Sequence, residues 1–166
     1  RVLSTKGMDN IFVGAGAGYS NTFGFNNTAC GTEALYANTT TYHNTAYGHQ
    51  ALYSNTGGNA TTAIGRSALW SNTTGTENTA CGYFALYQNI AGSYNTAFGN
   101  SALYFNTTGI NNTAIGFGAG VNTGNLNNTT AIGFQAIVDA SNKIRLGNAS
   151  VTVIEGQVAY TFTSDS

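Results

Sequence analysis

The sequence contains no proline and very little charge. Proline is absent from all 166 residues, and Lys, Arg, Asp and Glu together make up 7%, against roughly 25% in typical soluble domains. Between Asn10 and Val138 the charged residues are Glu33, Arg66 and Glu77. A chain without basic clusters offers no electrostatic basis for binding nucleic acid or an anionic membrane surface.

Cysteine and long apolar runs are also scarce. Two cysteines do not make a disulfide framework, and no apolar run approaches the roughly 20 residues of a membrane-spanning helix. The chain opens on Arg1 without a signal peptide, so a fragment or a processed product is expected. Yet 10 Tyr, 9 Phe and one Trp are too many aromatic residues for a disordered chain. These rings must be buried in the fold or against partner chains.

One sequence motif recurs along the chain. The stretch "NTACGTEAL" begins at Asn27, and "NTAYGHQAL" begins at Asn44. The glycine of this motif recurs every 17 residues without an insertion, at Gly14, Gly31, Gly48, Gly65, Gly82, Gly99, Gly116 and Gly133. A fixed period of this kind indicates a stacked architecture.

The period predicts a β-solenoid. Helical repeats need about 33 residues or more for two helices and a turn, whereas Thr, Ile, Tyr and Phe favour strands and Gly and Asn favour corners. We therefore predict an all-β, parallel, β-roll-like solenoid of eight 17-residue turns, with two short strands per turn, near N-T-A-x-G and x-A-L-Y. At a strand spacing of about 4.8 Å the rod would be roughly 38 Å long.

Stacking also explains why each column keeps one residue type. Identical Asn side chains lying one above another can form a hydrogen-bonded ladder that satisfies their amides at the corners. The predicted structural ladder consists of Asn10, Asn27, Asn44, Asn78, Asn95 and Asn112. A second Asn column runs through Asn21, Asn38, Asn55, Asn72, Asn89 and Asn106. Strict Ala columns indicate places with room for no more than a methyl group.

The composition changes at both ends. Residues 1–9 lie outside the pattern and form a lead-in, residues 10–138 form the solenoid, and charge returns in residues 139–166. Solenoids need end caps that stop open-ended stacking. Residues 139–166 are therefore predicted to be a C-terminal β cap or a connector to another domain.

The repeats resemble those of known fibres. N-T-A-x-G-x-x-A is similar to the head repeats of trimeric autotransporter adhesins and to repeats of phage tail fibres. The end of the chain, "NKIRLGNASVTVIEGQVAYTFTSDS", resembles the segment that precedes an endosialidase-type intramolecular chaperone. Such a chaperone promotes trimer assembly and cuts itself off beside a Ser-Asp pair, which would correspond to Ser164 and Asp165. The resemblance implies a homotrimer of parallel coils and a chaperone domain beyond this chain.

The alternation of side chains along the predicted strands favours packing against a partner chain. In N-T-A-x-G and A-L-Y, apolar side chains alternate onto both faces of the strands. One set can fill the coil, and the other would need a partner. The sequence alone leaves open which set points inward.

We find no constellation for catalysis or for a metal. His43 and His49 are interpreted as surface corner residues, since no carboxylates accompany them at ligand spacing. Glu33 and Glu77 each stand alone, whereas acid–base catalysis needs a base or a carboxylate pair in a cleft. The chain is therefore predicted to be no enzyme, to hold no metal and to need no cofactor.

Two further motifs have structural interpretations. Cys30 and Cys81 share a column three turns apart, about 14 Å at strand spacing, which is beyond the reach of a disulfide. They are interpreted as small apolar core residues, although cysteines from three chains would meet if the column faced a threefold axis. The "GAGAG" of residues 14–18 lacks the lysine and the helix of a phosphate-binding loop, and is interpreted as a packed corner.

An aromatic column is the candidate for ligand contact. Evenly spaced rings can stack on sugars, or they can pack between chains, and packing is the favoured interpretation. The column comprises Tyr36, Tyr53, Trp70, Tyr87 and Tyr104.

Several functions fit this sequence. The first is a structural and adhesive segment of an extracellular or virion fibre, a rigid trimeric rod that binds a cell-surface receptor, with a glycan as the expected class, by multivalent contacts. An ice-binding solenoid is the second, because Thr28, Thr45, Thr62 and their counterparts form a regular column. A non-binding filament subunit is the third. A polysaccharide-degrading spike is disfavoured, because this chain lacks the catalytic carboxylate pair that such an enzyme would need.

Overall fold

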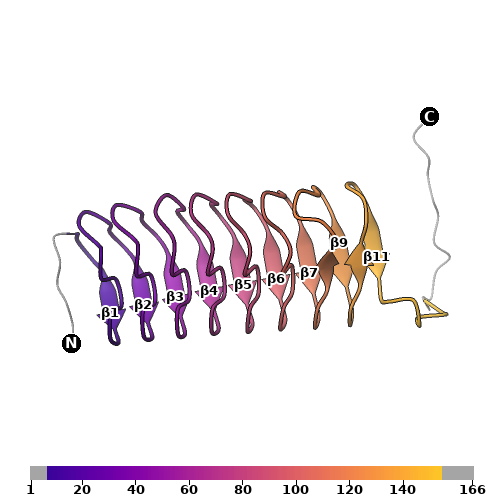
Figure 1. The fold of residues 1–166 in the computed structure, drawn as a ribbon, viewed down its shortest axis with the longest axis horizontal. Coiled ribbons are helices and arrows are strands. Elements are labelled where there is room, and N and C mark those ends of the chain that lie inside the picture. The colour runs from indigo at the N-terminus through magenta and orange to yellow at the C-terminus, as the bar shows by residue number, and fades with distance from the viewer. Residues whose placement is uncertain (1–6, 155–166) are drawn as a thin grey trace.

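The computed structural model describes residues 7–154, and up to β11 the chain forms a straight stack of similar turns (Figure 1). Each turn contributes one three-residue strand to a parallel sheet whose order is β1-β2-β3-β4-β5-β6-β7-β9-β11. These strands are β1 (Ile11–Val13), β2 (Thr28–Cys30), β3 (Thr45–Tyr47), β4 (Thr62–Ile64), β5 (Thr79–Cys81), β6 (Thr96–Phe98), β7 (Thr113–Ile115), β9 (Thr130–Ile132) and β11 (Ile144–Leu146). The prediction of an all-β parallel solenoid of about eight turns is confirmed.

The register places like residues above like residues. Thr45 pairs with Thr62 and Ala46 with Ala63, an offset of 17 residues. The last step is shorter, because Ile144 pairs with Thr130 at an offset of 14. Residues of the C-terminal segment therefore add a ninth strand to the sheet, although they fall outside the 17-residue period.

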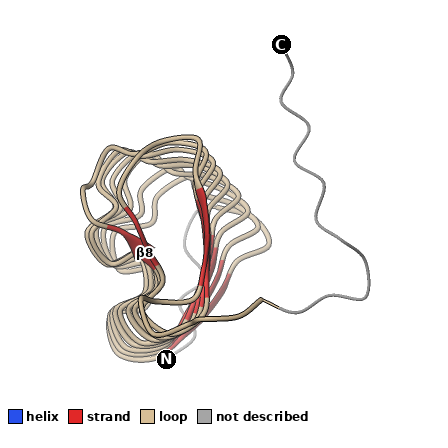
Figure 2. Cartoon of the chain, turned by 90° about the vertical axis from the view of Figure 1, so that its right-hand side faces the viewer, coloured by secondary structure: helices blue, strands red, loops and turns tan. Residues whose placement is uncertain are grey.

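Viewed along the stack, successive turns lie nearly on top of one another around a common interior (Figure 2). Small and medium side chains fill this interior. The middle residue of every strand except β11 is buried, and so are a second Ala and a Leu in each of five turns. The five leucines are Leu35, Leu52, Leu69, Leu86 and Leu103. This settles which columns point inward: Ala, Leu and both Asn columns fill the coil, whereas Thr, the apolar residue after Ala and the aromatic residue after Leu lie on the outside.

The first turn exchanges two side chains without losing volume. Phe12 occupies the Ala column and is 1% exposed. Gly18 occupies the Leu column, and a Cβ there would lie 2.6 Å from Cδ2 of Phe12. The ring of Phe12 thus fills the space that leucine fills in the next turns, so close packing is maintained.

The predicted second strand at x-A-L-Y is wrong for the turns that contain this motif. Glu33 has φ 56° and Leu35 has φ 54°, and the equivalent residues of the following turns are also left-handed. Left-handed residues interrupt the pleat of a strand, even though the backbone still bonds between turns: Leu35 N–H donates to the carbonyl of Ala51 at 3.0 Å. Burial of the leucine offsets the roughly 1–2 kcal/mol that this conformation costs.

The last two turns do form a second strand there. In these turns the Leu-Tyr pair is replaced by Gly120-Val121 and Ile137-Val138, which are strands β8 (Gly120–Val121) and β10 (Ile137–Val138). They pair in parallel, Val138 opposite Val121. Without a left-handed residue at this position the side chains invert, so Val121 and Val138 are buried where the earlier turns place an aromatic ring outside.

Candidate binding surfaces

The two Asn columns are stacked, and they work in different ways. In the first column, the side-chain oxygen accepts from the backbone of the next turn: Asn44 N–H donates to Oδ1 of Asn27 at 3.0 Å, and Asn112 N–H to Oδ1 of Asn95 at 2.9 Å. The Nδ2 groups of Asn10, Asn27, Asn44, Asn78, Asn95 and Asn112 donate to carbonyls 14 residues further along the chain. This column therefore fastens backbone to backbone through side chains.

The second column is a true amide ladder. Asn89 Nδ2 donates to Oδ1 of Asn72 at 2.8 Å, and Asn106 Nδ2 to Oδ1 of Asn89 at 2.9 Å. Between Asn38 and Asn55 the hydroxyl of Thr41 is inserted, donating to Asn38 and accepting from Asn55 Nδ2 at 3.2 Å. These amides are fully buried and hydrogen-bonded, and in the first column the amides from Asn27 to Asn112 are buried as well, so none of them can contact an external ligand.

The aromatic column forms a continuous stack along one flank of the rod. Tyr36 and Tyr53 have ring centroids 5.1 Å apart and an interplanar angle of 9°. The stack continues through Trp70 and Tyr87 to Tyr104, with centroid distances of 5.6, 5.5 and 5.4 Å. All five rings are half-buried. Offset stacking of this kind stabilises aromatic pairs by about 0.5–1.5 kcal/mol each.

Tyr19 extends the stack by one ring that the sequence analysis missed. Its centroid is 5.0 Å from that of Tyr36, with an interplanar angle of 3°. Tyr19 follows Gly18 instead of a leucine, so it does not match the Leu-aromatic motif. Its position 17 residues before Tyr36 was nevertheless a sufficient signal. Partial burial, then the neighbouring phenols of Tyr19 and Tyr53, and lastly Glu33 raise the pKa of Tyr36.

The sheet presents a second surface of a different kind. Its outer face carries the Thr column and, beside it, a column of apolar side chains. The apolar column consists of Val13, Cys30, Tyr47, Ile64, Cys81, Phe98, Ile115, Ile132 and Leu146. Tyr47 is 59% exposed and Phe98 58%. The interpretation of Cys30 and Cys81 as core residues is wrong: both are free thiols on this outer column and half-exposed.

The histidines occupy separate places on the surface. His43 Nε2 lies 3.1 Å from Nδ2 of Asn26, and its ring meets that of Tyr42 edge-on at 5.1 Å. His49 directly follows Gly48 and is exposed. Within residues 7–154, no three His, Cys, Asp or Glu side chains gather as a metal site would require.

The isolated carboxylates also have ordinary surroundings. Glu33 accepts a 2.8 Å hydrogen bond from Nε2 of Gln50 one turn later. Asp139 pairs with Lys143 at 2.7 Å, and this hydrogen bond is the main cause that lowers the pKa of Asp139. The predicted cleavage pair Ser164 and Asp165 lies outside the described residues.

No protein-family model matches the chain, and no curated protein sequence matches it either. Within the described residues, no helix is long and apolar enough to cross a bilayer.

Proposed function

We propose that the chain is a structural and adhesive segment of an extracellular or virion fibre, a rigid homotrimeric rod that binds a cell-surface receptor through repeated weak contacts. The observation that carries this proposal is the outward apolar column on the nine-stranded sheet. It extends without interruption from Val13 to Leu146 along the length of the rod. Contiguous exposed apolar surface of this extent is typical of a protein–protein interface.

A second copy of the same chain is the occupant that this face fits. Each strand contributes one side chain to the apolar column. A second solenoid that lies parallel and in register can therefore place one of its own apolar side chains against each of them. The column carries no charged side chain, so the contact leaves no buried ion unpaired. Closed assembly around an axis along the rod would cover this column in every copy.

The mass of the native particle in solution tests the assembly. We expect three times the chain mass of 17.2 kDa. Ile64→Asp places a carboxylate in the middle of the column and should dissociate the particle to monomers. Ile90→Asp is the matched control, since Ile90 is similarly exposed, 47% against 42% for Ile64, but lies away from the sheet. A monomeric wild-type protein would refute the trimer.

Oxidative cross-linking tests the direction of the chains. In a parallel, in-register assembly, Cys30 meets Cys30 and Cys81 meets Cys81. Peptide mapping after mild oxidation should therefore find the two symmetric disulfides. Cys30–Cys81 links between chains would indicate an antiparallel arrangement and contradict the proposal.

The Thr column keeps an ice-binding role as a second candidate. Thr28, Thr45, Thr62, Thr79, Thr96, Thr113 and Thr130 lie in register on the outer face of the sheet. The neighbouring column is uneven, however, because large rings such as Tyr47 and Phe98 alternate with the small side chains of Cys30 and Cys81. A thermal-hysteresis assay on the purified rod decides between the two, and a hysteresis well above that of a control protein would favour the ice-binding role.

A further inference from the structure

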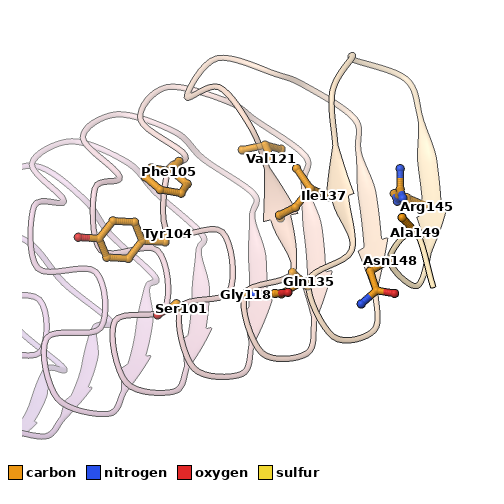
Figure 3. Close-up of a pocket in the computed structure, with 12 residues that line it drawn as sticks. Ser101, Tyr104, Phe105, Gly118, Val121, Gln135, Ile137, Arg145, Asn148 and Ala149 are labelled. Atoms are coloured by element: carbon orange, nitrogen blue, oxygen red, sulfur yellow. The ribbon is translucent and has the colours of Figure 1, made fainter. Parts of the chain in front are cut away.

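The aromatic stack ends at Tyr104, and a groove of about 650 Å³ begins there (Figure 3). One side of the Tyr104 ring is covered by Tyr87 at 5.4 Å. The next residue in the column is Val121, which points into the core, so no ring continues the stack. The groove therefore opens beyond the last ring of the stack. Tyr104 and Phe105 both line it, and their rings meet edge-on with centroids 5.0 Å apart.

Two features of the sequence make the groove. Val121 and Val138 occupy the aromatic column in the last two turns, and because both are buried no ring lies along the flank there. Gly118 leaves the floor of the groove without a side chain. A Cβ at Gly118 would meet only Cγ of Gln135, at 3.5 Å. The hollow thus follows from the loss of the Leu-Tyr pair in the last two turns.

The far end of the groove carries a cation and an amide. Figure 3 shows Arg145 and Asn148 at the end opposite Tyr104, with Gln135 and Ile137 between them. Arg145 lies in β11, three strands after β6, so about 14 Å along the rod separates the two ends. Among the described residues, Arg145 forms no ion pair with a carboxylate, and its Nε donates to the carbonyl of Gly147 at 3.0 Å.

We propose that this groove binds an acidic oligosaccharide of two or three pyranose units. The apolar face of one sugar ring packs against the aromatic pair of Tyr104 and Phe105 at the end of the stack. Ser101, Gln135 and Asn148 supply hydroxyl and amide groups for sugar hydroxyls. The guanidinium of Arg145 takes a sugar carboxylate through a charge-assisted hydrogen bond.

This inference rests on the adhesive part of the proposed function, for which it names a site and a ligand class. Three grooves on one trimer would give the multivalency that turns weak single contacts into firm attachment. The groove lies on the flank of the aromatic stack, whereas the apolar column lies on the sheet.

The test titrates the full chain with trigalacturonate, with its methyl ester, which keeps the rings but lacks the charge, and with polyglutamate, which keeps charge without sugar. Binding is followed by isothermal titration and by NMR shifts of the Tyr104 ring. We expect trigalacturonate to bind, its methyl ester to bind about tenfold more weakly, and polyglutamate to leave the Tyr104 signals unchanged. Equal binding of polyglutamate would overturn the sugar site and indicate a merely basic surface.

Two variants locate the site. Gly118→Gln fills the floor of the groove and should abolish binding, and Arg145→Gln should weaken it about tenfold. Gln is compatible with the backbone at position 118, because Gln50 and Gln135 occupy the same column with φ 55° and 49°. Gly16→Gln makes the same change in that column at the other end of the rod and should leave binding intact.

The two proposals fail separately. Particle mass reports assembly, whereas the titration reports the groove. A trimer on which trigalacturonate does not move the Tyr104 signals would overturn the groove and leave the fibre segment standing. Binding that survives Gly118→Gln would also overturn the groove, with the occupant then elsewhere on the rod. A monomer that still binds would refute the trimer alone.

Discussion

Asn72 holds the turns before and after it together. Its Nδ2 donates to Oδ1 of Asn55 at 3.0 Å and to the carbonyl of Gly75 at 3.0 Å, while its own Oδ1 accepts from Nδ2 of Asn89 at 2.8 Å. The side chain is fully buried. One amide thus satisfies a donor and two acceptors that water cannot reach.

We therefore expect Asn72→Ala to lower the free energy of unfolding by about 2–4 kcal/mol, because it leaves buried polar groups unpaired and opens a cavity. Chemical denaturation followed by circular dichroism measures the loss. Asn100→Ala is the matched control: Asn100 is exposed, and its replacement should change stability by less than about 0.5 kcal/mol. Equal losses from both variants would show that the ladder contributes nothing specific.

Asp139 gives a pH-dependent prediction near the end of the solenoid. The hydrogen bond from Lys143 lowers the pKa of Asp139, with its backbone hydrogen bond and the charge of Lys143 acting in the same direction. Because the pKa is lower in the folded than in the unfolded chain, the stabilisation is present above the unfolded pKa and is lost as the pH falls through the folded pKa.

Carbon-13 NMR titration of the carboxyl group measures this pKa directly. We expect a midpoint below the ordinary value for aspartate, and a return toward that value in Lys143→Met. An unchanged midpoint in Lys143→Met would show that the ion pair does not form in solution.

Gly65 belongs to a glycine column in which successive turns approach each other closely. Its φ is +128°, and a Cβ there would lie 2.6 Å from the carbonyl oxygen of Gly82 in the next turn. Gly65→Ala should cost at least about 3 kcal/mol, since it combines backbone strain with a clash that no side chain can relieve. The midpoint of thermal unfolding measures the effect.

Gly57→Ala is the control for Gly65→Ala. A Cβ at Gly57 would come no closer than 3.3 Å, to a methyl group of Thr74, and the same column holds Thr40 and Thr108 in other turns. This variant should fold with nearly unchanged stability. Similar losses in both would mean that the close approach of Gly65 and Gly82 is not what restricts position 65.

The sequence predicted the stacking because the period is exact in length and the columns keep their residue types. Alternation could not say which face is inside, since apolar residues stand on both faces of N-T-A-x-G and A-L-Y. The left-handed leucines could not be foreseen, because leucine rarely adopts that conformation outside a constraint of this kind. The false second strand follows from that omission.

The candidate sites were foreseen less completely. Strict columns identified the five central rings, but the same strictness excluded Tyr19, whose preceding residue is Gly18. The groove was missed because it arises from a change in side-chain direction at Gly120 and Val121, not from a motif. The replacement of "ALY" by "AGV" at residues 119–121 was the available signal.

Trp70 lies in the middle of the aromatic stack, between Tyr53 and Tyr87, at interplanar angles of 6° and 14°. Trp70→Ser removes two stacked pairs at once and should lower the free energy of unfolding by about 1–3 kcal/mol, whereas Trp70→Tyr keeps both pairs and should cost far less. Tyr94→Ser is the control, because Tyr94 is 54% exposed. The difference between the Ser and Tyr variants at position 70 isolates the stacking. If both variants destabilise the protein equally, the aromatic column contributes no specific stacking energy. The proposed packing of a sugar ring at Tyr104 would then have no support from the stacking within the protein.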